Sequence, residues 1–282
     1  MTRLRIVTEC GQGVKAAGRC PPLMKWTGGK RRLLDFILPH LENIGERYFE
    51  PFIGGGAVFF ALNAAKSVIG DANPEVTNCY QQIQSNADRL IKCLRRLKNT
   101  EREYYRIREW EPSDKLNRAA RMLYLTRLSF NGIYRQNHNG KFNVPYGYKV
   151  YLKVADEEHL RIIQAKLRKT KIRTGDFAAI AADARDGDMI YFDPPYTVAH
   201  GNNGFVKYNA RIFSWEDQRR LAIFAKELLD RGCTIVVSNA DHPSINNLYP
   251  SFKRFRIERP SVIAADAQFR KTVTESLFVG TH

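Results

Sequence analysis

Short apolar runs alternate with stretches of helical periodicity along most of this chain. Apolar runs of four to eight residues bounded by turn residues are typical of buried strands, and strands that alternate with helices are typical of an α/β sheet. The sequence therefore predicts an α/β fold. The predicted strands are residues 48–49, 67–70, 171–174, 189–192 and 234–237, with residues 274–279 as an edge strand. The predicted helices are residues 31–41, 57–66, 74–98 and 215–231.

Residues 100–170 interrupt this alternation. They are rich in Arg, Tyr and Asn, and three turn signals (Asn131-Gly132, Asn139-Gly140 and Tyr146-Gly147) mark a long loop within them. We predict a mainly helical insertion that carries a functional loop and lies between two halves of one sheet. Residues 21–99 and 171–282 would then form the main domain, and residues 1–20 an N-terminal extension.

The charge of the chain favours a polyanionic partner. Its net charge is +16, with a pI of about 9.7. Residues 118–173 alone carry 13 Lys or Arg against 3 Asp or Glu. Such clustering favours nucleic acid, through phosphate neutralisation and counterion release, although a generally basic, solvated surface is the alternative.

The sequence contains no apolar run of membrane-spanning length and no signal peptide, so we expect a cytoplasmic protein that does not bind membranes. Its five cysteines are odd in number and scattered, which is typical of reduced thiols. The six histidines are also dispersed. We therefore expect no metal site.

The tetrapeptide Asp193-Pro194-Pro195-Tyr196 follows the predicted strand 189–192 and is the most informative motif. Two prolines stiffen the loop and remove two backbone donors, which leaves a carboxylate, bare carbonyls and an aromatic ring. This set suits a planar group whose amine donates two hydrogen bonds while its ring is stacked, as in a nucleobase. A proline-rich turn that ends a strand is the alternative, but chance would place the full tetrapeptide in only about one such chain in a thousand.

A glycine loop, Gly54-Gly55-Gly56, lies between a predicted strand and a predicted helix, where backbone can approach a ligand closely. Asp71 ends the next strand, 15 residues after Gly56, where an acid can accept both hydroxyls of a ribose. The loop does not match the G-x-G-x-x-G pattern of nicotinamide cofactor sites. A nucleoside ligand without pyrophosphate is the better prediction, and a tight strand–helix turn is the alternative.

A second glycine loop, residues 25–30, reads Lys-Trp-Thr-Gly-Gly-Lys. It lacks the full spacing of a phosphate-binding loop, and no Ser or Thr follows Lys30. Lys30 is instead a candidate partner for a ligand carboxylate. The alternative is a surface turn beside a core tryptophan.

Together, these stretches resemble the DNA adenine methylase (Dam) family of S-adenosylmethionine-dependent methyltransferases. The resemblance extends over residues 23–279. The matching motifs follow the family's order: Lys25-Trp26-Thr27-Gly28-Gly29-Lys30, Glu50-Pro51-Phe52-Ile53-Gly54-Gly55-Gly56, Asp71-Ala72-Asn73, Phe130-Asn131-Gly132, Lys141-Phe142-Asn143-Val144-Pro145-Tyr146-Gly147, Gly175-Asp176-Phe177 and Asp193-Pro194-Pro195-Tyr196.

The resemblance implies a Rossmann-like methyltransferase sheet, mixed and mostly parallel with seven strands. Residues 21–99 and 171–282 would be the catalytic domain, and residues 100–170 a mainly helical target-recognition insertion. The implied cofactor is S-adenosyl-L-methionine. Its implied binding residues are Trp26, Lys30, Phe52, Gly54, Gly56, Asp71, Asp176, Phe177 and Asp193.

The implied reaction is methylation of the exocyclic N6 amine of an adenine flipped from double-stranded DNA. Asp193 and the carbonyl of Pro194 would accept the two amine hydrogens, Pro195 would stiffen the loop and Tyr196 would stack on the base. Lys25, Arg135, Gln136, Asn137, Asn139 and Lys141 would contact DNA.

GATC-methylating members tend to have an aromatic residue after the equivalent of Arg135 and an arginine near the position of Asn139. Gln136 and Asn139 depart from that pattern. GATC specificity therefore does not follow from the resemblance.

Two alternatives to adenine methylation in DNA stay open. One is methylation of the exocyclic amine of cytosine, or of a base in RNA, because the same loop geometry would serve. The other is a catalytically inactive DNA-binding relative. A restriction endonuclease partner is compatible with the sequence, and so is a monomer or a weak dimer.

Overall fold

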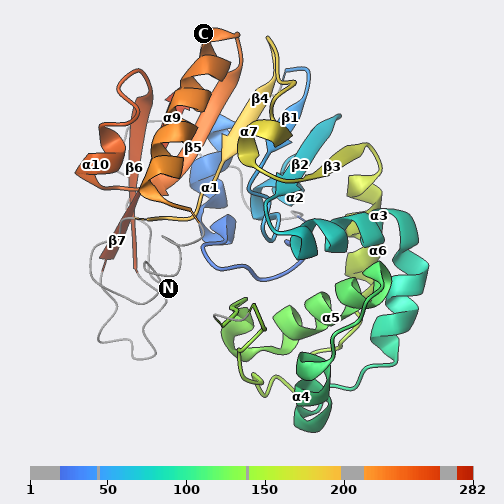
Figure 1. Cartoon of the computed structure of the whole chain (residues 1–282). Helices are drawn as coiled ribbons and strands as arrows, with labels where there is room; N and C mark the ends of the chain where they lie inside the picture. Colours follow the sequence, from blue (N-terminus) through green and yellow to red (C-terminus); the bar gives the residue numbers. More distant parts are fainter. Residues whose placement is uncertain (1–19, 43–44, 138–139, 198–212, 261–271, 282) are drawn as a thin grey trace. The chain divides into compact units, whose positions relative to one another are not determined.

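A computed structural model describes residues 20–42, 45–137, 140–197, 213–260 and 272–281. Its seven strands form one mixed sheet in the order β3-β2-β1-β4-β5-β7-β6 (Figure 1). The pairs β2–β3, β1–β4 and β4–β5 are parallel, whereas β7 is antiparallel to β5 and β6. This topology confirms the predicted Rossmann-like α/β sheet. The strands are β1 (Tyr48–Glu50), β2 (Ser67–Asp71), β3 (Thr170–Thr174), β4 (Met189–Phe192), β5 (Thr234–Ala240), β6 (Lys253–Pro260) and β7 (Thr272–Gly280).

The edge of the sheet differs from the sequence-based prediction. Residues 274–279 lie in β7, which is an inner strand between β5 and β6, and the prediction of an edge strand there is wrong. The edge strand beside β7 is β6, and β3 forms the other edge. No strand was predicted at β6 because charged residues dominate its sequence. Only Phe255 and Ile257 alternate with these charges, which is the pattern of a protected edge strand.

Two predicted helices are shorter or more broken than expected. The helix α2 covers only Ala57–Ala61, because Leu62 already has extended backbone angles. Residues 30–40 form three short segments in place of one amphipathic helix. Pro39 lies inside the last of them and has no N–H to continue a helical ladder. The three segments are η1 (Lys30–Leu33), α1 (Leu34–Ile37) and η2 (Leu38–His40).

The remaining predicted helices are confirmed within a few residues. The helix α3 (Pro74–Arg95) begins with a proline, and the Asn73 side chain accepts a hydrogen bond from the backbone N–H of Glu75. The helix α9 (Trp215–Asp230) begins with a capping box between Ser214 and Asp217. Residues 100–170 contain α4 (Glu101–Glu109), α5 (Lys115–Leu128), η3 (Phe130–Gly132) and α6 (Glu157–Leu167). No helix in the described ranges is both long and apolar enough to cross a bilayer.

The chain divides into two compact units. Among the described residues, the first unit holds Asp35–Phe52 and the chain from Phe177 onward, with β1, β4, β5, β6 and β7. Its helices include α7 (Phe177–Ile180), α9, which packs along β5, and α10 (Pro243–Asn246) (Figure 1). Fully buried apolar residues of its strands, among them Phe49, Ile190 and Val236, form its core.

Among the described residues, the second unit holds 20–34 and Ile53–Asp176. It contains the parallel pair β2–β3 and the helices α2 to α6, of which α5 and α6 both pack against α3. Its core includes the fully buried tyrosines Tyr80, Tyr104 and Tyr124. The predicted division into a catalytic domain and an insertion at residues 100–170 stays a prediction.

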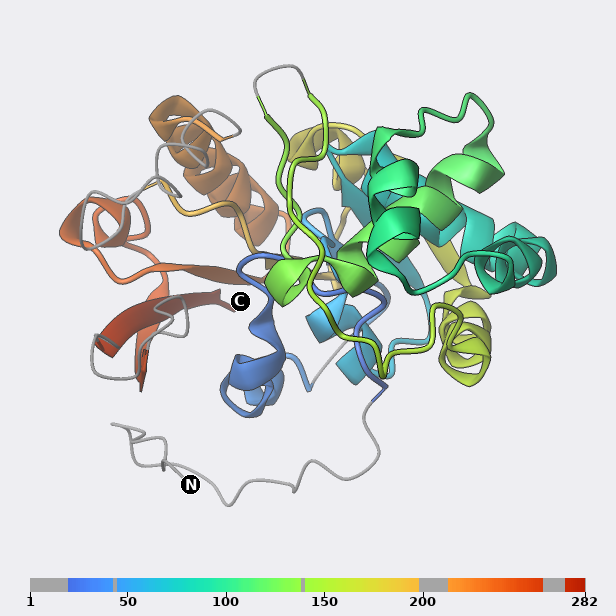
Figure 2. The ribbon, with the colours of Figure 1, turned by 90° about the horizontal axis from the view of Figure 1, so that it is seen from below.

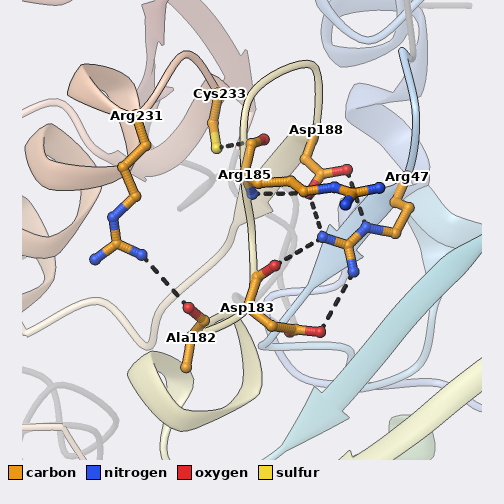
Figure 3. A network of polar contacts seen from close by, with 7 residues as sticks. All are labelled: Arg47, Ala182, Asp183, Arg185, Asp188, Arg231 and Cys233. Carbon is orange, nitrogen blue, oxygen red and sulfur yellow. Dashed lines mark hydrogen bonds and ion pairs between the residues drawn. The ribbon is translucent and has the colours of Figure 1, made fainter.

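A polar network fixes the start of β4, the strand that leads to Asp193 (Figure 3). The Arg47 guanidinium donates to both carboxylate oxygens of Asp188, at 3.1 Å from Nε and 2.6 Å from Nη2. The same guanidinium donates to the backbone carbonyl of Asp183, and the backbone N–H of Arg185 donates to Asp188. Asp188 has no exposed side-chain surface, so this bidentate pair satisfies a buried charge.

Candidate active site

The Asp-Pro-Pro-Tyr motif lies in the first unit, directly after β4, as predicted. The strand is fully buried, whereas Asp193 and Tyr196 are half-buried. β4 is parallel to both β1 and β5, so the motif begins at the carboxyl end of a parallel strand. Open α/β sheets bind their ligands at that end.

The two prolines of this loop have no N–H to donate, so they cannot hold it through backbone hydrogen bonds of their own. Side chains from α9 and β5 hold it instead. The Gln218 side-chain amide donates to the Pro195 carbonyl at 3.0 Å, and Asn239 Nδ2 donates to Gln218 Oε1 at 2.9 Å. Both amide side chains belong to fully buried residues. Each therefore fixes the orientation of the other, and the loop carbonyl has a defined direction.

The Tyr196 hydroxyl has two polar neighbours on β5 and β7. It donates to Glu275 Oε2 at 2.8 Å and lies 3.1 Å from Ser238 Oγ. Burial and then the negative charge of Glu275 raise the pKa of Tyr196 well above its usual range. The phenol therefore stays protonated at physiological pH, and its ring is anchored at the far end.

Phe52 and Phe177, two predicted cofactor residues, lie together in the first unit. Their rings stack with centroids 5.6 Å apart, and Phe213 meets Phe52 edge-on at 5.5 Å. The Arg220 guanidinium lies over the Phe177 ring at 4.6 Å. The rings thus form a buried aromatic cluster, in which Phe177 is only 3% exposed.

In the second unit, Asp71 lies at the carboxyl end of β2 beside the glycine loop. Its two carboxylate oxygens accept hydrogen bonds from the backbone N–H groups of Gly54 (3.0 Å) and Asn73 (2.9 Å). Burial raises the pKa of Asp71 to about 6, against the opposing effect of these two hydrogen bonds. A carboxylate has about four acceptor positions, so this anchored group retains capacity for ligand hydroxyls.

The glycine loop has a backbone that favours glycine. Gly54 and Gly56 have φ values of +44° and +76°, in the left-handed region. A Cβ on Gly54 would lie 2.6 Å from Cδ1 of Trp26, so the indole packs directly on the loop. The Tyr80 hydroxyl donates to the Gly54 carbonyl at 2.9 Å, which holds the loop from inside the unit.

The loop of residues 25–30 lies in the same unit. Lys30 is only 4% exposed, and its Nζ donates to the carbonyl of Gly28 at 2.9 Å. Within the described part of the chain, the Thr27 hydroxyl is a buried group without a hydrogen-bond partner. Buried polar groups normally have partners, so an unmatched hydroxyl in this loop is a candidate contact for a polar ligand.

Asp176 follows Gly175, whose N–H donates to the Asp71 carbonyl at 3.1 Å. The second unit thus places Trp26, Gly54, Asp71 and the Gly175–Asp176 turn along a continuous set of contacts. Asp193, Phe52 and Phe177 belong to the first unit.

Four of the predicted DNA-contacting residues lie on one hairpin of the second unit (Figure 2). Its arms are joined by an antiparallel bridge between Gln136 and Phe142, and the Asn137 side chain accepts from the backbone N–H of Lys141. Arg135 is exposed and donates to Asn143 Oδ1 at 2.9 Å, whereas Lys141 pairs with Glu111 at 2.9 Å. Asn139 lies outside the described residues.

Lys25, the remaining predicted contact, lies against the start of this segment. A Cβ on Gly132 would be 2.5 Å from Cδ of Lys25, so the lysine stem packs on that glycine. Next along the chain, the Trp26 ring stacks on Tyr134 with centroids 4.9 Å apart. The loop of residues 25–30 is therefore in direct contact with the segment that leads into the hairpin.

The sequence analysis missed five residues of this arrangement: Gln218, Ser238, Asn239, Glu275 and Tyr134. A signal was present for three of them. Ser238 and Asn239 follow the predicted strand 234–237, whose carboxyl end adjoins that of β4. Glu275 is a charged residue in an otherwise strand-like run, which is unusual enough to mark a buried polar contact.

Comparisons with known proteins identify the family of the chain. Residues 26–263 match the sequence pattern of the family described as D12 class N6 adenine-specific DNA methyltransferase. The chain is 39% identical over 264 residues to the type II methyltransferase M1.LlaDCHI of Lactococcus lactis subsp. cremoris, covering 90% of this chain and 93% of that protein.

Two further relatives are each 32% identical to the chain. The type II methyltransferase M.MjaIII of Methanocaldococcus jannaschii aligns over 274 residues, which are 89% of this chain and 95% of that protein. The DNA adenine methylase of Escherichia coli (strain K12) aligns over 262 residues, which are 90% and 93% of the two chains. The predicted family is confirmed: the chain belongs to the D12 class of N6 adenine-specific DNA methyltransferases.

Proposed function

We propose that this protein transfers the methyl group of S-adenosyl-L-methionine to the exocyclic N6 amine of an adenine that has been flipped out of double-stranded DNA. The observation that carries the proposal is the Asp193–Tyr196 loop at the carboxyl end of β4. Gln218 donates to the Pro195 carbonyl of this loop, and Glu275 accepts from the Tyr196 hydroxyl. Membership of an adenine-specific methyltransferase family supports the same reaction.

The amine of adenine is a poor nucleophile because its lone pair is delocalised into the ring. Asp193 and the Pro194 carbonyl would accept hydrogen bonds from its two N–H groups, which draws the nitrogen toward tetrahedral geometry and directs the lone pair at the methyl carbon. The C–N bond would form as the bond from sulfur to the methyl group breaks, which leaves a neutral thioether, and the amine would then lose one proton. Tyr196 would hold the base by stacking on its ring. Positioning and electrostatics therefore provide the rate acceleration, through groups that need no reorganisation.

The bound cofactor supplies an electrophilic methyl group on a sulfonium. Asp71 would accept the ribose hydroxyls, and the left-handed backbone of Gly54 and Gly56 allows a close approach to the ligand. Lys30 would bind the carboxylate at the methionine end, with Trp26 beside it. Of the other proposed cofactor residues, Asp176, Phe177 and Phe52 would frame the adenine ring, and Asp193 would lie at the junction with the target base.

The hairpin would read the DNA. Arg135, Gln136 and Asn137 carry the donors and acceptors that base edges require, and Asn139 is proposed with them on sequence alone. Lys25 and Lys141 would contact phosphates, which position the protein without specifying a sequence. The excess of basic residues would supply the counterion-release part of the affinity.

The proposed partner is therefore double-stranded DNA, and the proposed setting is the cytoplasm, in association with the nucleoid. A restriction endonuclease partner, and a monomer or a weak dimer, stay predictions.

The test is methyl transfer by the purified protein from labelled S-adenosyl-L-methionine to duplexes of varied sequence, followed by mass spectrometry of the nucleosides. N6-methyladenine in duplex DNA is expected. N4-methylcytosine, or label in RNA only, would support the alternative substrates. Cofactor binding by calorimetry without label in any nucleic acid would identify an inactive relative. Sequencing of methylated DNA from cells that express the protein would then identify the recognition site.

A further inference from the structure

We propose that Glu275 is a positioning residue for the reaction, because it fixes the ring of Tyr196 through the tyrosine hydroxyl. The inference rests on the proposed function, in which that ring stacks on the target base. All the residues involved belong to the first unit.

Glu275 occupies a position where a carboxylate is costly. It lies in β7, is only 3% exposed, and is followed in the strand by the buried Leu277 and Phe278. Burying a carboxylate is unfavourable unless hydrogen bonds compensate. The Tyr196 hydroxyl provides such a bond at 2.8 Å, so the carboxylate and the phenol stabilise each other in the interior.

The contact determines where the aromatic ring lies. Tyr196 follows two prolines, so its backbone is stiff, and its side chain has only two rotatable torsions. A hydrogen bond at the far end of the ring removes the freedom that remains. Ser238, on the adjacent β5, lies 3.1 Å from the same hydroxyl and gives it a second polar neighbour.

The far end of the ring is therefore held from two paired strands. In the register of β5 and β7, Ala240 is opposite Glu275 and Ser238 is opposite Leu277, so the two polar neighbours lie close together on the sheet. All of these contacts lie within the protein and need no DNA. The ring is thus preorganised to receive the base, which avoids an ordering cost during catalysis.

The experiment measures methylation kinetics for the wild-type protein and for Glu275→Ala, Glu275→Gln, Tyr196→Phe and the double variant Tyr196→Phe/Glu275→Ala. Glu275→Ala should lower kcat by about 100-fold, the scale expected for a reacting group displaced by about 1 Å. The KM for the cofactor should not change. Glu275→Gln keeps an acceptor oxygen, and its kcat should remain within about threefold of the wild type.

The double variant distinguishes a role of Glu275 in positioning the Tyr196 ring from a role in the stability of the whole protein. If Glu275 acts through the Tyr196 hydroxyl, its removal in the Tyr196→Phe background should lower kcat by no more than about twofold further. A target adenine replaced by 2-aminopurine adds a spectroscopic readout. Its fluorescence should be quenched by stacking in the wild-type complex and should rise in Glu275→Ala. The matched control is Glu258→Gln, which removes an exposed carboxylate from the neighbouring β6 and should behave as the wild type.

Wild-type kcat in Glu275→Ala, or fully multiplicative losses in the double variant, would overturn the inference while leaving the proposed function intact. If Glu275→Ala does not fold, Tyr196→Phe decides, since full activity without the hydroxyl refutes a role for its contact with Glu275. A wild-type protein that methylates no nucleic acid refutes the proposed function first, and the positioning role with it.

Discussion

The indole of Trp26 stacks on the phenol ring of Tyr134, with centroids 4.9 Å apart and planes 20° apart. Trp26 belongs to the Lys-Trp-Thr-Gly-Gly-Lys loop, whereas Tyr134 immediately precedes the hairpin that is proposed to read DNA. The Tyr134 side chain therefore supports the residue that packs on the glycine loop at Gly54.

This contact predicts that Tyr134→Leu weakens cofactor binding although Tyr134 lies in no cofactor motif. Loss of one stacked pair should cost about 1 kcal/mol, or about fivefold in Kd. Tyr134→Phe retains the ring and should bind as the wild type does. Calorimetric titration with S-adenosyl-L-methionine measures the difference, and equal affinities for the Leu and Phe variants would show that the stack is irrelevant to binding.

Asp193→Ala should abolish methyl transfer and leave DNA binding largely intact. The carboxylate is proposed to accept a hydrogen from the target amine, a contact made at the reacting nitrogen, and its loss should lower kcat by at least about 100-fold. Methylation assays and DNA-binding titrations on the same preparation check both halves. Undiminished methylation by this variant would remove the proposed mechanism.

Cofactor affinity should fall in mildly acidic solution, because the pKa of Asp71 is raised to about 6. Above that pH the carboxylate is ionised and accepts the ribose hydroxyls strongly, and below it the added proton removes the charge. If only the ionised form binds, Kd should be about tenfold higher at pH 5 than at pH 7.

Calorimetry across this pH range measures the effect, with Asp71→Asn as the control. The amide should bind weakly and show no step near pH 6. A step of the same size in Asp71→Asn would assign the titration to another group.

Arg135 and Lys141 should behave differently although both lie on the hairpin. Arg135→Ala should reduce discrimination between the correct and the wrong base pair at one position by about 1–3 kcal/mol. Lys141→Ala should weaken binding to all DNA sequences equally and should reduce the slope of log K against log salt concentration by about one. Methylation rates on the recognised duplex and on single-mismatch duplexes, at two salt concentrations, separate the two effects. Equal losses on every duplex for Arg135→Ala would reassign that residue to phosphate contact.

Arg47→Met should destabilise the protein strongly, although Arg47 is not among the proposed active-site residues. It leaves the fully buried Asp188 carboxylate without its bidentate partner, which should lower the free energy of unfolding by about 3–5 kcal/mol. The comparison is Arg106→Met, whose pairing with Glu103 is largely exposed and is expected to contribute only about 0–1 kcal/mol. Urea denaturation measures both, and similar losses in the two variants would contradict the assigned role of Asp188.

Local patterns in the sequence were enough to predict much of the fold. The strand of residues 189–192 was identified from four apolar residues followed by two prolines, and the start of α3 from Pro74. Asp71 and Gly54 were predicted at one site from a glycine loop and an acid one strand later, and the structure joins them through a 3.0 Å hydrogen bond. Each of these signals lies within a short segment of chain.

Only the tertiary structure decided the contacts between segments that are distant in sequence. Tyr196 and Glu275 are 79 residues apart, and Trp26 is separated from Tyr134 by more than a third of the chain. β7 is an inner strand because β6 pairs with it. The charged residues of β6 give no apolar pattern from which this pairing could be predicted. The sequence by itself determined the family motifs and predicted which residues carry the proposed chemistry, because composition and spacing are local properties. Only folding determined which side chains hold them, because register and packing bring together residues that no local pattern connects.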